Sequence, residues 1–363
     1  MSHWTHPRRE APRGQERPSE ARSRSSELGR EVTIGEAVVA NVVANEDHAV
    51  ANDEHVVTND EPTVANDEPT VALLQVGHLR GLVDPRLASL RDVAAWEQAE
   101  DPVVAVHRAR VATRRLRAFV RLYAPLLGSK RARKLERRLR AITRALGPVR
   151  EHDVLTAGLR ALQADAEPLA RAALEHVEAW AQGQRRKAAR RAHAALADVD
   201  AAALAEALEG EVDRVSGRLL RHDEPLAARA TALLEPELAR AFEGMPRPTG
   251  QTDMEALHEV RIRAKRLRYA LALLDPLLCE PHRSLPPLLE RVQSTLGEHR
   301  EAAQLLERVH ERRAALAAQG LPTLAGALDP VEATLLHRRQ RAFERAMRAL
   351  ARLDTHALGP SPA

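Results

Sequence analysis

Two segments of the chain each place a histidine at the head of a ladder of arginine and lysine residues. The first runs from His107 to Arg117, and the second runs from His258 to Arg268, 151 positions further along. The basic positions coincide at that offset: His107 with His258, Arg110 with Arg261, Arg114 with Lys265, Arg115 with Arg266, and Arg117 with Arg268. Guanidinium and ammonium groups at this density suit a ligand with many negative charges, and the planar guanidinium suits phosphate oxygens in particular.

The repeat extends beyond the two ladders. Leu146-Gly-Pro-Val-Arg150-Glu151 matches Leu296-Gly-Glu-His-Arg300-Glu301 at an offset of 150, and leucines that precede these segments match as well. An internal repeat must be identified before a fold is assigned. We interpret the body of the chain as a tandem duplication of a unit of roughly 140–150 residues, near the common size of a domain.

On a helix, the ladder residues gather on one side. At about 100° per residue, His107, Arg110, Arg114, Arg117 and Arg121 share one arc, and apolar residues occupy the opposite arc. A charged helix face is commonly just solvated. However, cations three or four residues apart repel one another by a few tenths of a kcal/mol per pair. Both copies keep this unfavourable arrangement without an acidic residue in the arc, which indicates a shared anionic ligand.

Composition favours helices and divides the chain by charge. Aromatic residues make up only 2%, and alanine, leucine and arginine dominate, as in helix-on-helix packing. The chain has 55 basic and 51 acidic residues. The first 75 residues contain 7 of the basic and 14 of the acidic residues. Residues 76–363 therefore contain 48 basic and 37 acidic residues, so the basic excess lies there. Cys279 is the only cysteine, which excludes disulfides within the chain and cysteine-cluster zinc sites.

Residues 1–72 differ from the rest and predict a disordered region. Residues 1–30 are rich in Arg, Ser, Pro and Glu and show no periodicity. From Asn45 an acidic motif returns every seven positions up to residue 71. Seven is also the period of a coiled coil, but valine is nearly the only apolar residue in each unit and two of the units contain a proline. We therefore expect a flexible acidic repeat.

From about residue 73 the pattern is helical and is punctuated by proline and glycine. The expected helices are 76–99, 102–127, 130–146, 149–165, 168–198, 201–221, 225–243, 252–275, 282–296, 299–318 and 330–353. One of the expected breaks falls at Gly297. Long helices joined by short turns predict two antiparallel bundles, at about 73–223 and 224–354, with a flexible tail at 355–363.

The His-x-x-Arg-x-x-x-Arg/Lys-Arg-Leu-Arg segments, each followed by Leu-Gly-x-x-Arg-Glu, resemble the CHAD domain, the conserved histidine α-helical domain. The resemblance covers roughly residues 76–352 and includes the duplication. It implies an all-α fold of two four-helix bundles related by a pseudo-two-fold axis around a basic central groove. It also implies binding of inorganic polyphosphate and, in several members, a location on polyphosphate granules.

The resemblance carries ligand-facing roles to the ten paired ladder residues, and the candidate set adds Arg121, Arg150 and Arg300. The function expected is non-catalytic binding of inorganic polyphosphate, with no cofactor and no metal. Nucleic-acid binding by the same basic surface is the first alternative, because electrostatics alone does not separate two polyanions. An enzyme acting on polyphosphate or a nucleotide is the second alternative.

Other polar clusters carry weaker signals. His152-Asp153 is a single His-Asp dipeptide without further candidate metal ligands, so it does not support a metal-dependent phosphohydrolase. The basic clusters Arg185–Arg191 and His337–Arg341 either extend the groove or cover outer surfaces, and the sequence leaves both possibilities open. No apolar stretch is long enough to span a membrane and no secretory signal is apparent, so a cytoplasmic protein is expected. The resemblance to the CHAD domain adds the expectation of an association with polyphosphate granules.

Overall fold

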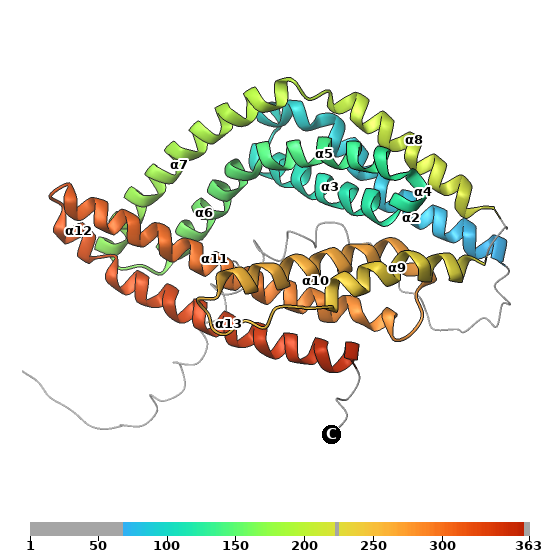
Figure 1. Cartoon of the computed structure of the whole chain (residues 1–363). Coiled ribbons are helices and arrows are strands. Elements are labelled where there is room, and N and C mark those ends of the chain that lie inside the picture. The colour runs from blue at the N-terminus through green and yellow to red at the C-terminus, as the bar shows by residue number, and fades with distance from the viewer. Residues whose placement is uncertain (1–67, 222–224, 359–363) are drawn as a thin grey trace, which may run out of the picture.

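The computed structural model describes residues 68–221 and 225–358, and every regular element within them is a helix (Figure 1). The elements are α2 (Glu68–Arg91), η1 (Asp92–Gln98), α3 (Pro102–Leu122), α4 (Ala124–Leu127), α5 (Ser129–Ala145), α6 (Gly147–Ala164), α7 (Pro168–Ala197), α8 (Ala201–Leu219), α9 (Leu226–Phe242), α10 (Met254–Leu274), η2 (Asp275–Leu277), η3 (His282–Ser284), α11 (Leu285–Ala318), α12 (Pro322–Gly326) and α13 (Asp329–Leu358). The prediction of an all-α protein is confirmed.

Both ends of the described chain are more helical than expected. Helix α2 begins at Glu68, so the prediction of disorder was wrong for residues 68–72. Pro69 is tolerated because it lies in the first turn, where its missing N–H has no partner to lose. Helix α13 continues to Leu358, which corrects the predicted tail for residues 355–358. Residues 1–67, with most of the acidic repeat, lie outside the described residues.

The predicted break at Gly297 is wrong, because α11 runs unbroken through it. In the first repeat the chain does break at the equivalent place: α5 ends at Ala145 and α6 starts at Gly147. The first repeat has Pro148 next to its glycine, whereas the second has Glu298. A proline removes a helix hydrogen bond and costs about 3 kcal/mol, whereas a glycine costs only about 1 kcal/mol.

The two ladder helices begin at aspartate caps. The Asp101 carboxylate accepts hydrogen bonds from the backbone N–H groups of Val103 and Val104 at the start of α3. Asp253 accepts one from Ala256 at the start of α10. These bonds satisfy N–H groups that lack a partner in the first turn, and each cap is typically worth about 1 kcal/mol. The caps therefore fix where the two helices that carry the ladders start.

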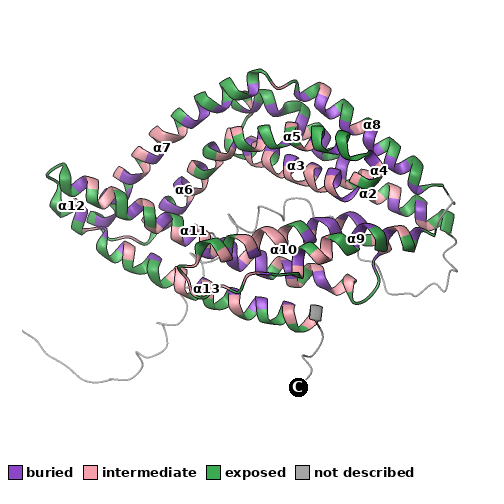
Figure 2. Ribbon diagram, in the orientation of Figure 1, coloured by how far each residue is buried: buried purple, intermediate pink, exposed green. Residues whose placement is uncertain are grey.

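The apolar faces form two buried clusters. Figure 2 shows buried residues, in purple, alternating with exposed ones along the helices. The larger cluster joins α2, α3, α5, α8, α9 and α10 with parts of α7, α11 and α13. The smaller cluster lies between α6, α7, α11, α12 and α13, where the pair α6–α7 meets the pair α11–α13 (Figure 1). Each cluster contains helices from both repeats.

Buried polar groups tie α2 to the end of α10. Gln75 donates from Nε2 to the carbonyl of Leu273 at 2.7 Å, and His78 Nε2 lies 2.7 Å from the carbonyl of Ala272. The hydroxyl of Tyr123 lies 3.3 Å from Gln75 Nε2, and burial raises the pKa of this tyrosine. Because the last carbonyls of a helix have no partner within the helix, these side chains satisfy them and fix α10 against the first repeat.

Candidate functional site

Side chains from both ladders line a single cavity of about 220 Å³ between α3 and α10, which we call the ladder cavity. Helix α3 contributes Arg114, Arg117 and Arg121, and α10 contributes Lys265 and Arg266. Five of the predicted binding residues are thus brought together from segments about 150 positions apart. Apolar atoms and the carboxylate of Glu237 on α9 complete the lining.

Like charges approach one another across this cavity. Burial and, next, the charge of Arg121 on α3 lower the pKa of Arg266 on α10. Burial and the same Arg121 also lower the pKa of Arg117. An anion placed between these groups would relieve the repulsion and form charge-assisted hydrogen bonds.

One carboxylate holds part of the first ladder. Glu136 on α5 accepts from Arg121 Nε and Nη2 at 2.9 and 2.6 Å, from Arg117 Nη2 at 3.3 Å and from Arg140 Nη2 at 3.2 Å. Burial alone would raise the pKa of Glu136, but the hydrogen bonds and charges of these arginines outweigh it and lower the pKa to about 2. Glu136 therefore positions Arg117 and Arg121 beside the cavity. Spacing within the ladder segments does not reveal Glu136, because it lies on another helix.

Replacing Glu136 with glutamine should lower the free energy of unfolding by about 1 kcal/mol at pH 7. The folded-state pKa is depressed, so this stabilisation is complete above pH 4.5 and is lost as the pH falls toward 2. Urea unfolding of E136Q and the parent protein across this range would measure it. E178Q is the control for the loss of a hydrogen-bonded carboxylate elsewhere in the protein. Glu178 accepts hydrogen bonds from Arg160, Gln163 and Gln182, away from the ladder cavity. Equal stability of E136Q and the parent at pH 7 would contradict the positioning role.

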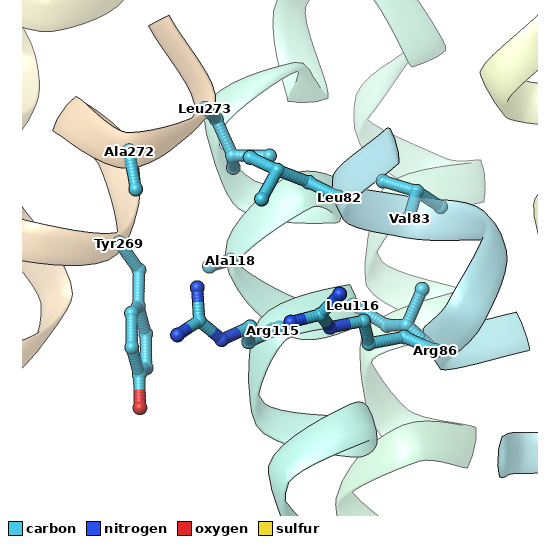
Figure 3. A pocket seen from close by; sticks show the side chains of 9 residues that line it. All are labelled: Leu82, Val83, Arg86, Arg115, Leu116, Ala118, Tyr269, Ala272 and Leu273. Carbon is cyan, nitrogen blue, oxygen red and sulfur yellow. The ribbon is translucent and has the colours of Figure 1, made fainter. Parts of the chain in front are cut away.

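An aromatic residue that the ladder analysis missed lies among the cations. The ring of Tyr269 on α10 has the Arg115 guanidinium 5.2 Å from its centroid, the Arg268 guanidinium at 5.5 Å and the Lys265 ammonium at 5.7 Å. Figure 3 shows the contact with Arg115, which joins the first repeat to the second. Tyr269 directly follows the second ladder. At the equivalent position, 151 residues earlier, the first repeat has Ala118.

Two other ladder arginines contact protein groups. Arg110 donates from Nη1 to the carbonyl of Thr143 at 2.8 Å, in the last turn of α5. The same nitrogen lies beside Gly147, where an added Cβ would be 3.4 Å from it, at van der Waals contact. Arg268 donates to Glu290 at 3.2 Å. These contacts help pack the ladder helices, whatever else these residues bind.

The remaining predicted residues lie on α3, α6, α10 and α11. His258 is near Arg261 of its own helix and Arg300 of α11, because burial and then the charges of Arg300 and Arg261 lower its pKa. His107 is half-buried on α3, and Arg150 is half-buried on α6. None of these five residues lines the 220 Å³ cavity.

The late basic clusters also lie away from that cavity, since neither α7 nor α13 contributes to its lining. Arg185 instead donates to Asp153 at 2.5 Å, and the Asp153 side chain is fully enclosed. Burial raises the pKa of Asp153, and the hydrogen bond and charge of Arg185 oppose this rise. Within residues 68–221 and 225–358, no three His, Cys, Asp or Glu side chains are placed to hold a metal ion.

A second cavity, of about 110 Å³, lies where α6 crosses α11. Equivalent positions of the two repeats line it from opposite sides: Glu151 and Glu301, and Leu155 and Leu305. Gly158 packs against Leu305 so closely that a side chain at Gly158 would come within 2.8 Å of it. The equivalent residues Arg114 and Lys265 also line the ladder cavity together.

Comparison with known proteins identifies the class. The CHAD domain family model matches residues 86–310, so the chain belongs to the CHAD domain family. Among solved structures, the CHAD domain from the plant Ricinus communis is 19% identical, covers 80% of this chain and 92% of its own, and has a TM-score of 0.52.

PptA from Streptomyces chartreusis is 18% identical, covers 77% of this chain and 99% of its own, and also has a TM-score of 0.52. At these identities the two likenesses show a common fold. No curated protein matches the sequence. None of the described helices is long and apolar enough to pass through a lipid bilayer.

Proposed function

We propose that this protein binds inorganic polyphosphate, without catalysis, through its two cationic ladders. The observation that carries the proposal is the single cavity lined by Arg114, Arg117 and Arg121 of one repeat and by Lys265 and Arg266 of the other. Membership of the CHAD domain family supports the same ligand class. The remaining ladder residues, with Arg150 and Arg300, would extend the contacts along a groove.

The binding energy would come mainly from charge. A polyphosphate chain has about one negative charge per phosphate and a shell of counterions, and contact with arginine releases these ions to solution. Guanidinium groups add charge-assisted hydrogen bonds, which are about twice as strong as neutral ones. The repulsion among Arg117, Arg121 and Arg266 in the empty cavity would be relieved at the same time.

Nucleic acid is also a polyanion, but the described residues offer little for its bases. Proteins that bind single strands stack the bases on aromatic rings. Tyr269 is the aromatic residue in the ladder cavity, and it is only 6% exposed, with its ring occupied by cations. Phe119 and Tyr123 are completely buried on the opposite face of α3. This surface therefore suits a ligand that consists only of phosphates.

Competition at physiological salt tests the proposal. Fluorescently labelled long-chain polyphosphate should bind, and unlabelled polyphosphate should displace it at far lower phosphate concentration than single-stranded DNA or RNA. Preferential displacement by DNA or RNA would instead favour the nucleic-acid alternative. Release of orthophosphate from the polymer in the presence of Mg²⁺ would favour an enzyme. Binding of this kind would also bring the protein to polyphosphate granules in cells that form them.

A further inference from the structure

Arg86 on α2 is a buried cation that the ladder motif does not include. Its side chain is only 5% exposed, and it extends alongside Arg115 of α3 toward Tyr269 (Figure 3). The Nη1 atom of Arg86 and the Nε atom of Arg115 have no hydrogen-bond partner among the described residues. Burial and then the charge of Arg115 lower the pKa of Arg86. Within residues 68–221 and 225–358, neither guanidinium group forms an ion pair with a carboxylate.

At the position equivalent to Arg86, the second repeat has a residue of opposite charge. Asp84-Pro85-Arg86 in α2 corresponds to Glu235-Pro236-Glu237 in α9, at the same offset of 151 that relates the two ladders. Each proline lies inside its helix, which supports the correspondence. The partner of Arg86, Arg115, corresponds to Arg266. Burial and Arg121 lower the pKa of Arg266, while the charges of Glu259, Glu237 and Glu136 act against this.

The position that holds a glutamate beside the arginine in the second repeat therefore holds another arginine in the first. A buried charge without a partner is costly, and natural proteins usually pair it. A glutamate at position 86 would restore the pairing found in the second repeat. A negatively charged ligand atom placed beside Arg86 and Arg115 would supply the compensating charge instead.

We propose that Arg86 and Arg115 form a subsite for one small anionic atom, either a phosphate oxygen or a free halide. A cavity of about 10 Å³ lies between these two side chains, Tyr269 and neighbouring apolar residues. That volume is about the size of one water-sized sphere. Ala118 and Tyr269 line this cavity and the larger ladder cavity alike. A phosphate held in the larger cavity could therefore direct an oxygen past the edge of Tyr269; this phosphate source rests on the proposed function.

The experiment compares Arg86→Glu with Arg108→Glu, which has the same charge change on an exposed position of α3. The parent protein and R108E should melt at higher temperature in sodium chloride than in sodium gluconate of equal ionic strength, and R86E should lose this difference. The affinity for pyrophosphate should fall about ten-fold more in R86E than in R108E, the effect of one charge-assisted hydrogen bond. Identical behaviour of the two variants in both measurements would overturn the subsite.

Further arms separate the sources and guard against misfolding. A chloride response that R86E abolishes, without loss of pyrophosphate affinity, would assign the subsite to a free halide. Arg86→Met removes the charge at similar volume and is used if R86E does not fold. Crystals of the parent protein soaked in bromide should show anomalous density between Arg86 and Arg115 if a halide fills the subsite, and a water molecule there in both bromide-soaked and pyrophosphate-soaked crystals would overturn the proposal. Failure of the parent to bind long-chain polyphosphate would overturn the proposed function and leave the halide result standing.

Discussion

Replacement of Arg114, Arg117, Lys265 and Arg268 together by alanine should abolish binding of long-chain polyphosphate while the helical circular dichroism signal remains. Three of these side chains line the ladder cavity, and Arg268 contacts Tyr269 beside it. A hydrogen bond to a charged group contributes about 1.5–3 kcal/mol, so the loss of four such groups should weaken binding by at least about 1,000-fold. Fluorescence anisotropy with labelled polyphosphate would measure the loss.

The chain offers a matched control for this variant. Arg108, Lys134, Arg137 and Arg190 are exposed and carry the same charges, three arginines and one lysine. Alanine at these four positions removes the same net charge and should weaken binding only slightly. In cells that store polyphosphate, the tagged parent and control should concentrate on granules and the ladder variant should stay dispersed. Equal losses in the two quadruple variants would mean that net charge, rather than the cavity, determines binding.

Long-chain polyphosphate should raise the melting temperature of the protein by about 5–10 °C at roughly 100 times its Kd. A ligand at that excess stabilises the folded state by about 2.7 kcal/mol, and each kcal/mol shifts the melting temperature of a large domain by about 2–4 °C. The physical source is the relief of repulsion among Arg117, Arg121 and Arg266. Differential scanning fluorimetry would record the shift.

Pyrophosphate should raise the melting temperature less, because it spans fewer ladder residues. Sodium gluconate at matched ionic strength controls for general screening, which weakens the same repulsion without a bound ligand. The quadruple ladder variant should lose the polyphosphate shift. If gluconate gave the same shift as long-chain polyphosphate, a specific phosphate site would be contradicted.

The ladder cavity could be anticipated in outline because the repeat lies in the sequence itself. The equivalence of Arg114 with Lys265 and of Arg115 with Arg266 is visible from spacing, and helical periodicity places each set on one face. Which of these residues would share a cavity depends on how α3 packs against α10, and spacing within one helix does not determine that. Arg110 illustrates the difference: it lies in the ladder arc, yet it donates to the end of α5.

Residues from other helices were missed for the same reason. Glu136 holds two ladder arginines from α5, and Arg86 reaches Arg115 from α2. Neither residue belongs to the ladder motif. Arg86 and Glu237 occupy equivalent positions in the aligned repeats but carry opposite charges. The sequence shows this difference, and only the burial of Arg86 in the structure shows that it matters. Tyr269 directly follows the second ladder and could have been singled out from the sequence, but the ring contacts depend on the fold.

The error at Gly297 has a simple physical lesson. The sequence predicts a break there because glycine commonly interrupts helices. The break in the first repeat follows from Pro148, which lacks the N–H that a continuous helix requires. With Glu298 in place of the proline, α11 stays continuous over its 34 residues and packs along α13.

The sharing of both apolar clusters between the repeats limits how the protein can be divided. Leu155 and Leu159 of the first repeat are buried in the same cluster as Leu305 and Val309 of the second. A polypeptide cut at the link between α8 and α9 would leave each fragment with uncovered leucine faces. We therefore expect that neither repeat folds alone, and that a single repeat would need a second chain to cover its leucine faces.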